Sequence, residues 1–255
     1  MHWTTPRVTR PRGVGRRRPV ERPAVKLRLA AVVLAVASLT ACANGGGHGT
    51  ATIWITRDRG SHVLLVGHVP AGLTAMQGLD RVADIKTRYA GRYVQAIDGV
   101  EGSLTARHDW FYFINGYESD RSAAEYRLHP GDVEWWDFRD WRRSMTEPLV
   151  VGAFPEPFLH GYNGRRRSSA VVYAPGLAKS AHRLARMIHA VTVVPSGTNL
   201  MKGVNLLVLE RGRTAIWAQV MGSHPGDPVR FVVSGAASKL AANPGLVRYR
   251  YDLLR

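Results

Sequence analysis

The chain has 255 residues, enough for one large domain or two small ones, and its 45% content of hydrophobic residues excludes a generally disordered protein. The formal net charge is +16, but residues 1–41 hold nine Lys or Arg against the single acid Glu21, so +8 of that excess lies in this segment. Because Cys42 is the only cysteine, an intramolecular disulfide is excluded and the stability of the fold must come from its core.

The N-terminal segment predicts export from the cytoplasm. Lys26 and Arg28 precede an uncharged, mostly apolar run over residues 29–41. This run is too short to span a bilayer, which takes about 20 residues, but it fits the apolar centre of a signal peptide. Residues 1–41 are therefore predicted to be a signal peptide with a basic N-terminal region, and both Met1 and Val25 are compatible with the start of translation.

The end of the run, Leu39-Thr40-Ala41-Cys42, resembles the bacterial lipobox, in which the cysteine is diacylated and becomes the first residue. The resemblance implies a lipid on Cys42, a flexible Gly-rich tether over residues 42–50, and a location on the extracytoplasmic face of the cell membrane. Two alternatives stay open. Ala41-Cys42-Ala43 also fits ordinary signal peptidase, which would release a secreted protein, and Leu27–Ala43 is also compatible with a buried helix.

The first folded domain is predicted over residues 51–143. Alternating β-forming residues in Thr52–Thr56 and an apolar run in His62–Val69 predict a hairpin. Thr74 and Gln77 have the spacing of a capping box, and the apolar residues that follow at helical spacing predict a helix over Ala75–Tyr89.

Three more strands are predicted in this domain, each bounded by a turn: Tyr93–Ile97, Trp110–Ile114 and Val133–Phe138. One helix would then pack against a mixed sheet of four or five strands. The predicted fold class of the chain is α+β.

Three motifs in this domain carry a resemblance to a known family: Gln95–Gly99, Trp110–Gly116 and Tyr126–Trp135, in that order after the Thr-capped helix. They resemble the small C-terminal domain of transcobalamin and intrinsic factor, which bacterial surface lipoproteins carry as a domain of unknown function. The resemblance covers about residues 51–141 and implies a compact domain related to the β-grasp shape. In the vitamin carriers the domain caps one face of cobalamin, so a cobalamin-like or other flat ligand is implied.

Aromatic residues provide the candidate binding contacts of this domain. In a strand, Trp110 and Tyr112 point to one side and Phe111 and Phe113 to the other, so one pair can fill the core while the other stays exposed. On this interpretation Trp110, Asn115, Tyr117 and Trp136 contact the ligand. The alternative is that both pairs are covered, one by the helix and one by the second half of the chain.

The second half, residues 148–255, is predicted to be an α/β domain of no recognised family. A strand over Ala170–Ala174, an amphipathic helix from Leu177 and a strand over Ala190–Val194 predict a βαβ unit. Three more strands and a short helix are predicted after it: Asn205–Glu210, Thr214–Met221, Val229–Val233 and Ala236–Ala242.

The sequence favours binding over catalysis. It contains no HExxH motif, P-loop, dinucleotide-binding glycine fingerprint or GxSxG elbow, so no cofactor or metal is predicted and the chain is not predicted to be an enzyme. His182 and His189 are interpreted as solvated helix residues rather than metal ligands. Four carboxylates are interpreted as solvated at turns and sheet edges: Asp132, Glu134, Asp137 and Asp140.

Two basic segments, Arg165–Arg167 and Arg248–Tyr251, have the composition of phosphate-binding and stacking elements, but the favoured interpretation is a solvated loop and a terminal strand. Outside the membrane the available polyanions are lipid headgroups and wall polymers, so nucleic acid is not a predicted partner.

The function that follows is a membrane-anchored extracytoplasmic binding lipoprotein that delivers a flat ligand, such as cobalamin, to an uptake system. The alternative is a structural or adhesive surface protein that binds another protein or a cell-wall polymer. The predicted partners are accordingly the membrane, through the N-terminal lipid, and a transporter or wall component.

Overall fold

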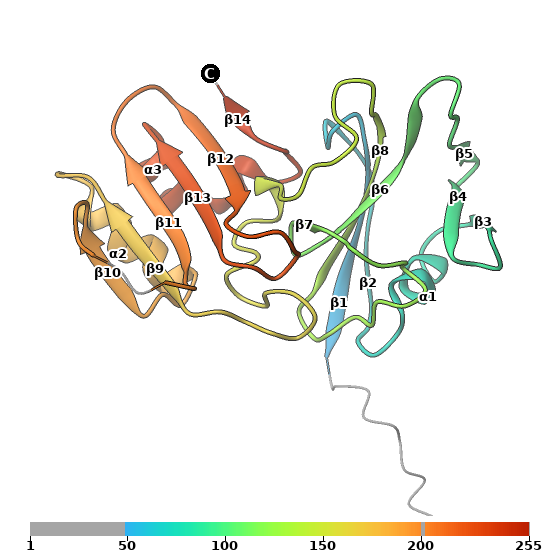
Figure 1. Cartoon of the computed structure of the whole chain (residues 1–255), viewed down its shortest axis with the longest axis horizontal. Coiled ribbons are helices and arrows are strands. Elements are labelled where there is room, and N and C mark those ends of the chain that lie inside the picture. The colour runs from blue at the N-terminus through green and yellow to red at the C-terminus, as the bar shows by residue number, and fades with distance from the viewer. Residues whose placement is uncertain (1–48, 200–201, 255) are drawn as a thin grey trace, which may run out of the picture. The chain divides into compact units, whose positions relative to one another are not determined.

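The computed structural model describes residues 49–199 and 202–254, which belong to one compact unit with two large sheets (Figure 1). The predicted signal peptide, the lipid attachment site Cys42 and the tether up to residue 48 lie outside the described residues. Within the described part of the chain, no helix is long and apolar enough to cross a membrane. The architecture is mixed α+β, with three sheets and few helices, as the sequence predicts.

The first large sheet has the strand order β2-β1-β8-β6-β7. Its strands are β1 (Thr50–Arg57), β2 (His62–Pro70), β6 (His108–Ile114), β7 (Tyr117–Glu118) and β8 (Val133–Asp140). β1 and β8 pair in parallel and the other neighbours are antiparallel, so the sheet is mixed and five-stranded. The predicted hairpin and the predicted strands after it at Trp110 and Val133 are confirmed.

The predicted helix over Ala75–Tyr89 is wrong in length. α1 spans only Ala75–Asp80 and begins with the predicted capping box, in which the Thr74 hydroxyl accepts from the Gln77 N–H at 3.1 Å. The chain then forms β3 (Ile85–Arg88), which pairs with β4 (Tyr93–Ile97). With β5 (Val100–Glu101) these strands make a separate three-stranded sheet, so Tyr93–Ile97 is a strand as predicted but lies outside the large sheet.

Both faces of the first large sheet are covered. On one face Trp110 and Trp136 belong to the same buried cluster as Met76 and Leu79 of α1. On the other face Phe113 and Trp135 pack with Tyr251, near the C-terminus. The structure therefore has the arrangement in which both aromatic pairs are covered, one on the helix side and one by the second half of the chain.

The second large sheet has the order β10-β9-β11-β13-β12-β14 and follows the short helix η1 (Val151–Ala153). Its strands are β9 (Ser169–Tyr173), β10 (Thr192–Pro195), β11 (Asn205–Glu210), β12 (Ala215–Val220), β13 (Val229–Ser234) and β14 (Leu253–Leu254). The helices of this half are α2 (Ala178–Met187), α3 (Ala237–Ala242) and η2 (Pro244–Val247).

The four strands β10, β9, β11 and β13 run in parallel, which confirms the predicted β9-α2-β10 unit. Buried residues of α2, among them Leu184, join the same cluster as the strands.

Hydrogen bonds join the two halves. The Tyr251 hydroxyl donates to Asp137 Oδ2 at 2.8 Å, and the Tyr117 hydroxyl donates to the carbonyl oxygen of Asp227 at 2.8 Å. The main buried cluster also contains residues of both large sheets, such as Ile53 and Phe231. Loops of both halves are thereby held against each other, and three of them form the pocket described next.

Candidate anion-binding pocket

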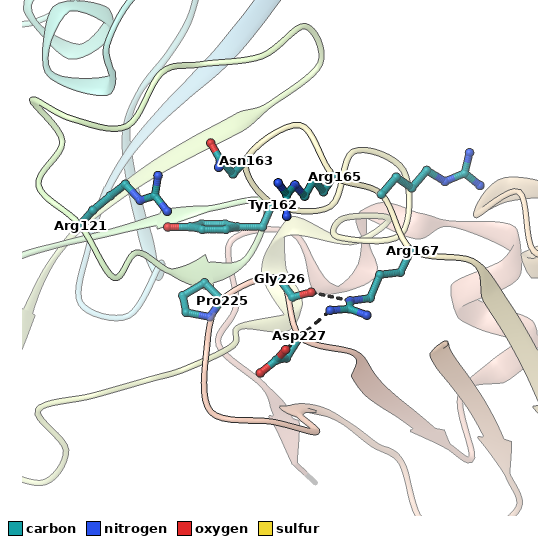
Figure 2. Close-up of a pocket in the computed structure, with 9 residues that line it drawn as sticks. Arg121, Tyr162, Asn163, Arg165, Arg167, Pro225, Gly226 and Asp227 are labelled. Carbon is teal, nitrogen blue, oxygen red and sulfur yellow. Dashed lines mark hydrogen bonds and ion pairs between the residues drawn. The ribbon is translucent and has the colours of Figure 1, made fainter. Parts of the chain in front are cut away.

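A basic pocket of about 430 Å³ lies where three loops meet (Figure 2). One loop follows β7, the second precedes β9, and the third connects β12 with β13. The lining residues are Arg121, Tyr162, Asn163, Arg165, Arg166, Arg167, Pro225, Gly226 and Asp227. The volume is in the range of small-molecule sites, which are roughly 300–1,000 Å³.

Tyr162 anchors the arginine-bearing loop. Its ring is only 4% exposed, and its hydroxyl donates to Asp120 Oδ1 at 2.8 Å. Burial raises the pKa of Tyr162 to about 12, so the hydroxyl keeps its proton and remains a donor at neutral pH. After Tyr162 the chain turns through Asn163 and Gly164, both at positive φ, which places the arginines that follow at the surface.

Two of the arginines are held by backbone carbonyls. Arg166 Nε donates to the Phe158 oxygen and Nη2 to the His189 oxygen, each at 3.0 Å. Arg167 Nε donates to the Gly226 oxygen at 2.5 Å. Carbonyl oxygens orient a guanidinium without neutralising it, so these hydrogen bonds leave both arginines charged.

The other two arginines, Arg121 and Arg165, differ in their contacts: Arg121 packs on an aromatic ring and Arg165 is exposed. The Arg121 guanidinium lies over the Tyr162 ring at 5.8 Å, and Figure 2 shows the two side chains next to each other. Arg165 is exposed and makes no side-chain hydrogen bond or ion pair with any residue in the described ranges. It is therefore available to bind a ligand without breaking an existing contact.

The charge balance of the pocket is positive. Four arginine residues line it, and two carboxylates face them: Asp227 Oδ1 lies 3.6 Å from Arg167 Nη2, and Asp120 Oδ1 lies 3.4 Å from Arg121 Nε. Arginine presents its donors in a planar fork that matches the oxygens of phosphate and carboxylate groups. The arrangement is suited to hold an anion, and it offers no nucleophile with an adjacent base.

The residues predicted from sequence as ligand contacts do not lie in this pocket. Trp110 and Trp136 line a smaller cavity of about 180 Å³, together with Tyr112 and residues near α1. Asn115 is fully buried and donates to Asp132 Oδ1 at 2.7 Å and to the Gly161 oxygen at 3.0 Å. Tyr117 is 1% exposed and holds the turn that carries Asp227.

The interpretation of the carboxylates as solvated is wrong for three of the four. Asp132, Glu134 and Asp137 are fully buried, whereas Asp140 is partly exposed and pairs with Arg142. Asp132 and Asp137 accept hydrogen bonds from side chains that are distant in sequence, such as Asn115 and Tyr251, which a local pattern does not reveal.

The histidines considered as metal ligands, His182 and His189, are both exposed. Among residues 49–199 and 202–254 there is no group of three or more His, Cys, Asp or Glu side chains arranged to hold a metal ion.

Sequence reasoning identified only part of the pocket. The run Arg165–Arg167 signals a phosphate-binding element, but Arg121 and Asp227 carry no local signal because they reach the pocket from distant loops. The other basic segment, Arg248–Tyr251, lies elsewhere: its Tyr251 is buried in the contact between the two halves.

Comparison with known proteins adds one finding about the first half. Residues 72–140 match the domain of unknown function DUF4430, which confirms that such a domain is present there. No curated protein matches the chain. Among solved structures, the chain is similar to a proposed metal-binding protein from Ruminococcus gnavus ATCC 29149, with 14% identity and a TM-score of 0.30, over 36% of this chain and 97% of that one.

Proposed function

We propose that this protein is a membrane-anchored extracytoplasmic binding protein, and that its basic pocket binds an anionic group. The observation that carries the proposal is the convergence of Arg121, Arg165, Arg166 and Arg167 on one cavity of about 430 Å³. Like charges repel each other, and two carboxylates, Asp120 at Arg121 and Asp227 at Arg167, offset the four arginines only in part. A bound anion offsets this positive charge, so its binding lowers the electrostatic free energy of the site.

The binding test is a calorimetric titration of the purified full chain with a panel of anions, inorganic phosphate among them. We expect saturable binding that weakens as salt is added, because screening reduces attraction between exposed charges. Arg165→Ala should lower the affinity about tenfold, the usual effect of losing one charge-assisted hydrogen bond.

Arg213→Ala is the matched control, since Arg213 is exposed and does not line the pocket. It removes the same charge and should leave the affinity within about twofold, because a distant exposed charge is largely screened. Equal losses in both variants would show that only the overall positive charge attracts the anion. The proposed pocket would then be excluded.

The proposed membrane anchor is a diacyl group on Cys42, which the lipobox-like Leu39–Cys42 supports. Mass spectrometry of the membrane fraction should find a chain that begins at a lipidated Cys42. Cys42→Ala should move the protein out of that fraction. Recovery of an unmodified Cys42 with residues 30–41 still attached would exclude the anchor.

A second candidate ligand is a flat molecule bound by the first half, as the resemblance to the cobalamin-capping domain and its β-grasp shape suggests. The supporting observation is the aromatic cavity lined by Trp110, Tyr112 and Trp136. At about 180 Å³ this cavity has room for only a small part of a ligand as large as cobalamin.

Titration of the purified protein with cobalamin, followed by tryptophan fluorescence, tests that candidate. Saturable quenching that Trp136→Phe reduces would support it. Absence of quenching at high micromolar cobalamin would remove it and leave the anion site as the proposed function.

A further inference from the structure

We propose that the basic pocket selects a phosphate that carries a proton over sulfate, and that Asp227 makes this selection. The inference rests on the proposed function, because it names the class of anion that the same arginines bind.

The carboxylate of Asp227 is fixed through one oxygen, while the other forms an ion pair with Arg167 and accepts no hydrogen bond within the described residues. Its Oδ2 accepts from the backbone N–H groups of Ser223 and His224, both at 3.0 Å. Its Oδ1 faces Arg167 Nη2 at 3.6 Å, which is beyond hydrogen-bond distance. Within the described residues no hydrogen bond to Oδ1 occurs, so this oxygen keeps its acceptor capacity at the pocket wall.

Hydrogen bonds also fix the backbone of Asp227. The Asp227 N–H donates to the His224 oxygen at 3.0 Å, and the Asp227 carbonyl accepts from the buried Tyr117 hydroxyl at 2.8 Å. Figure 2 shows Asp227 beside Gly226, with contacts from Arg167 to both residues. An anion held by the arginines therefore meets a carboxylate oxygen at a fixed position.

A carboxylate oxygen beside the arginines distinguishes anions that carry a proton from anions that do not. A carboxylate can only accept hydrogen bonds, so it needs a donor from the ligand. Inorganic phosphate carries at least one P–OH group at neutral pH and can donate to Asp227 Oδ1, forming a short charge-assisted bond. Sulfate is fully ionised and brings only acceptors, so two acceptor oxygens would face each other and repel.

The arginines do not provide this discrimination, because phosphate and sulfate have similar size and similar charge. A phosphodiester has no P–OH group either, so lipid headgroups and diester-linked polymers should bind less well than inorganic phosphate. The ligand class is therefore free phosphate, which keeps a P–OH group at neutral pH, or a monoester, whose P–OH form is abundant near and below its pKa of about 6.

The experiment is calorimetry on the full chain at neutral pH and constant ionic strength, with inorganic phosphate, sulfate and dimethyl phosphate. We expect phosphate to bind about tenfold more tightly than either of the others, since a site that hydrogen-bonds a ligand hydroxyl rejects analogues without it. Asp227→Asn should bring sulfate to within about twofold of phosphate, because the amide can donate while its oxygen keeps the turn. Asp80→Asn is the control, because Asp80 is exposed and does not line the pocket. This variant should keep the wild-type preference for phosphate over sulfate.

The outcomes separate this inference from the proposed function. Equal affinity of the wild type for phosphate and sulfate, with both weakened about tenfold in Arg165→Ala, would overturn the inference and keep the anion site. Absence of binding for all three anions would overturn the proposed function itself. A preference unchanged in Asp227→Asn would exclude Asp227 as its cause. If that variant does not fold, Asp227→Ser, which also keeps an acceptor for the turn, replaces it with the same expectation.

Discussion

At the scale of single residues, the most informative group is the buried carboxyl of Glu134. Its Oε1 accepts from Trp136 Nε1 at 2.6 Å, while its Oε2 is buried without a hydrogen-bond partner among the described residues. Burial, with a smaller contribution from nearby Asp132, raises the pKa of Glu134 well above its usual value. Protonation removes the charge, which is how a carboxyl is tolerated in an apolar core.

This carboxyl gives the folding free energy a predictable dependence on pH. A raised folded-state pKa means that the folded chain binds the proton more tightly than the unfolded chain does. The stabilisation is fully present below the unfolded pKa, near 4.5, and is lost as the pH rises toward the raised value. The slope for one proton is at most about 1.4 kcal/mol per pH unit.

Glu134→Gln should remove that slope, because the amide keeps an acceptor for Trp136 and does not ionise. Urea denaturation of both proteins from pH 4.5 upward measures the difference. Other buried acids, such as Asp137, remain in both proteins and cancel in the comparison. If the free energy of unfolding changes with pH in the same way in the wild type and in Glu134→Gln, Glu134 is not protonated in the folded protein.

A second residue-scale prediction concerns the contact between the two halves. The Tyr251 hydroxyl is one of the donors to Asp137, with the Thr56 hydroxyl at 2.6 Å and the Gly60 N–H at 3.0 Å. Tyr251→Phe leaves part of the acceptor capacity of Asp137 unused in a buried site, so we expect a loss of about 1–3 kcal/mol in the free energy of unfolding.

Tyr249→Phe is the matched control for that prediction. The Tyr249 ring packs on Trp54 at 4.7 Å, but its hydroxyl makes no hydrogen bond in the described part of the chain. This control should change the free energy of unfolding by less than about 0.5 kcal/mol. If both variants are equally stable, the bond between Tyr251 and Asp137 contributes nothing to holding the halves together.

At the scale of elements, the sheets follow from the sequence more closely than helix α1 does. Runs of β-forming residues that end at turns predict strands, so β1, β6 and β8 are found where the sequence predicts them. The predicted length of α1 is too great because Val82 and Ala83 continue the helical spacing of apolar residues. The chain beyond Asp84 instead pairs with β4. Periodicity within one segment contains no information about a pairing partner elsewhere.

Gly78, in the middle of α1, tests how closely this helix lies on the sheet. On helix propensity alone Gly78→Ala should stabilise the protein by about 1 kcal/mol. A Cβ at this position, however, would lie 2.8 Å from Leu128 Cδ1 and 3.1 Å from Glu134 Oε2. We therefore expect a net loss of about 1–3 kcal/mol by overpacking.

Thermal unfolding of Gly78→Ala beside Asp80→Ala provides the measurement, since Asp80 is exposed on the same helix. The Asp80 variant should unfold at or slightly above the wild-type temperature. A Gly78 variant that is more stable than the wild type would show that α1 is farther from the sheet than described.

At the scale of the whole molecule, the pocket depends on contacts that no single segment encodes. The arginine run at residues 165–167 is visible in the sequence, whereas its position opposite Arg121 and Asp227 exists only once the loops of both halves meet. The role of Tyr117 also depends on a contact with a distant part of the chain. Its aromatic character suggested a ligand contact, but its hydroxyl instead holds the turn before β13.

The most direct test of the account is a crystal structure of the protein with arsenate, which is protonated like phosphate and scatters anomalously. We expect an anomalous peak in the basic pocket, within hydrogen-bond distance of Arg165 and of at least one of Arg121 and Arg167, with Asp227 on its other side. An arsenate found only at other sites, or a pocket empty at saturating arsenate, would contradict the central claim that these arginines form an anion-binding site.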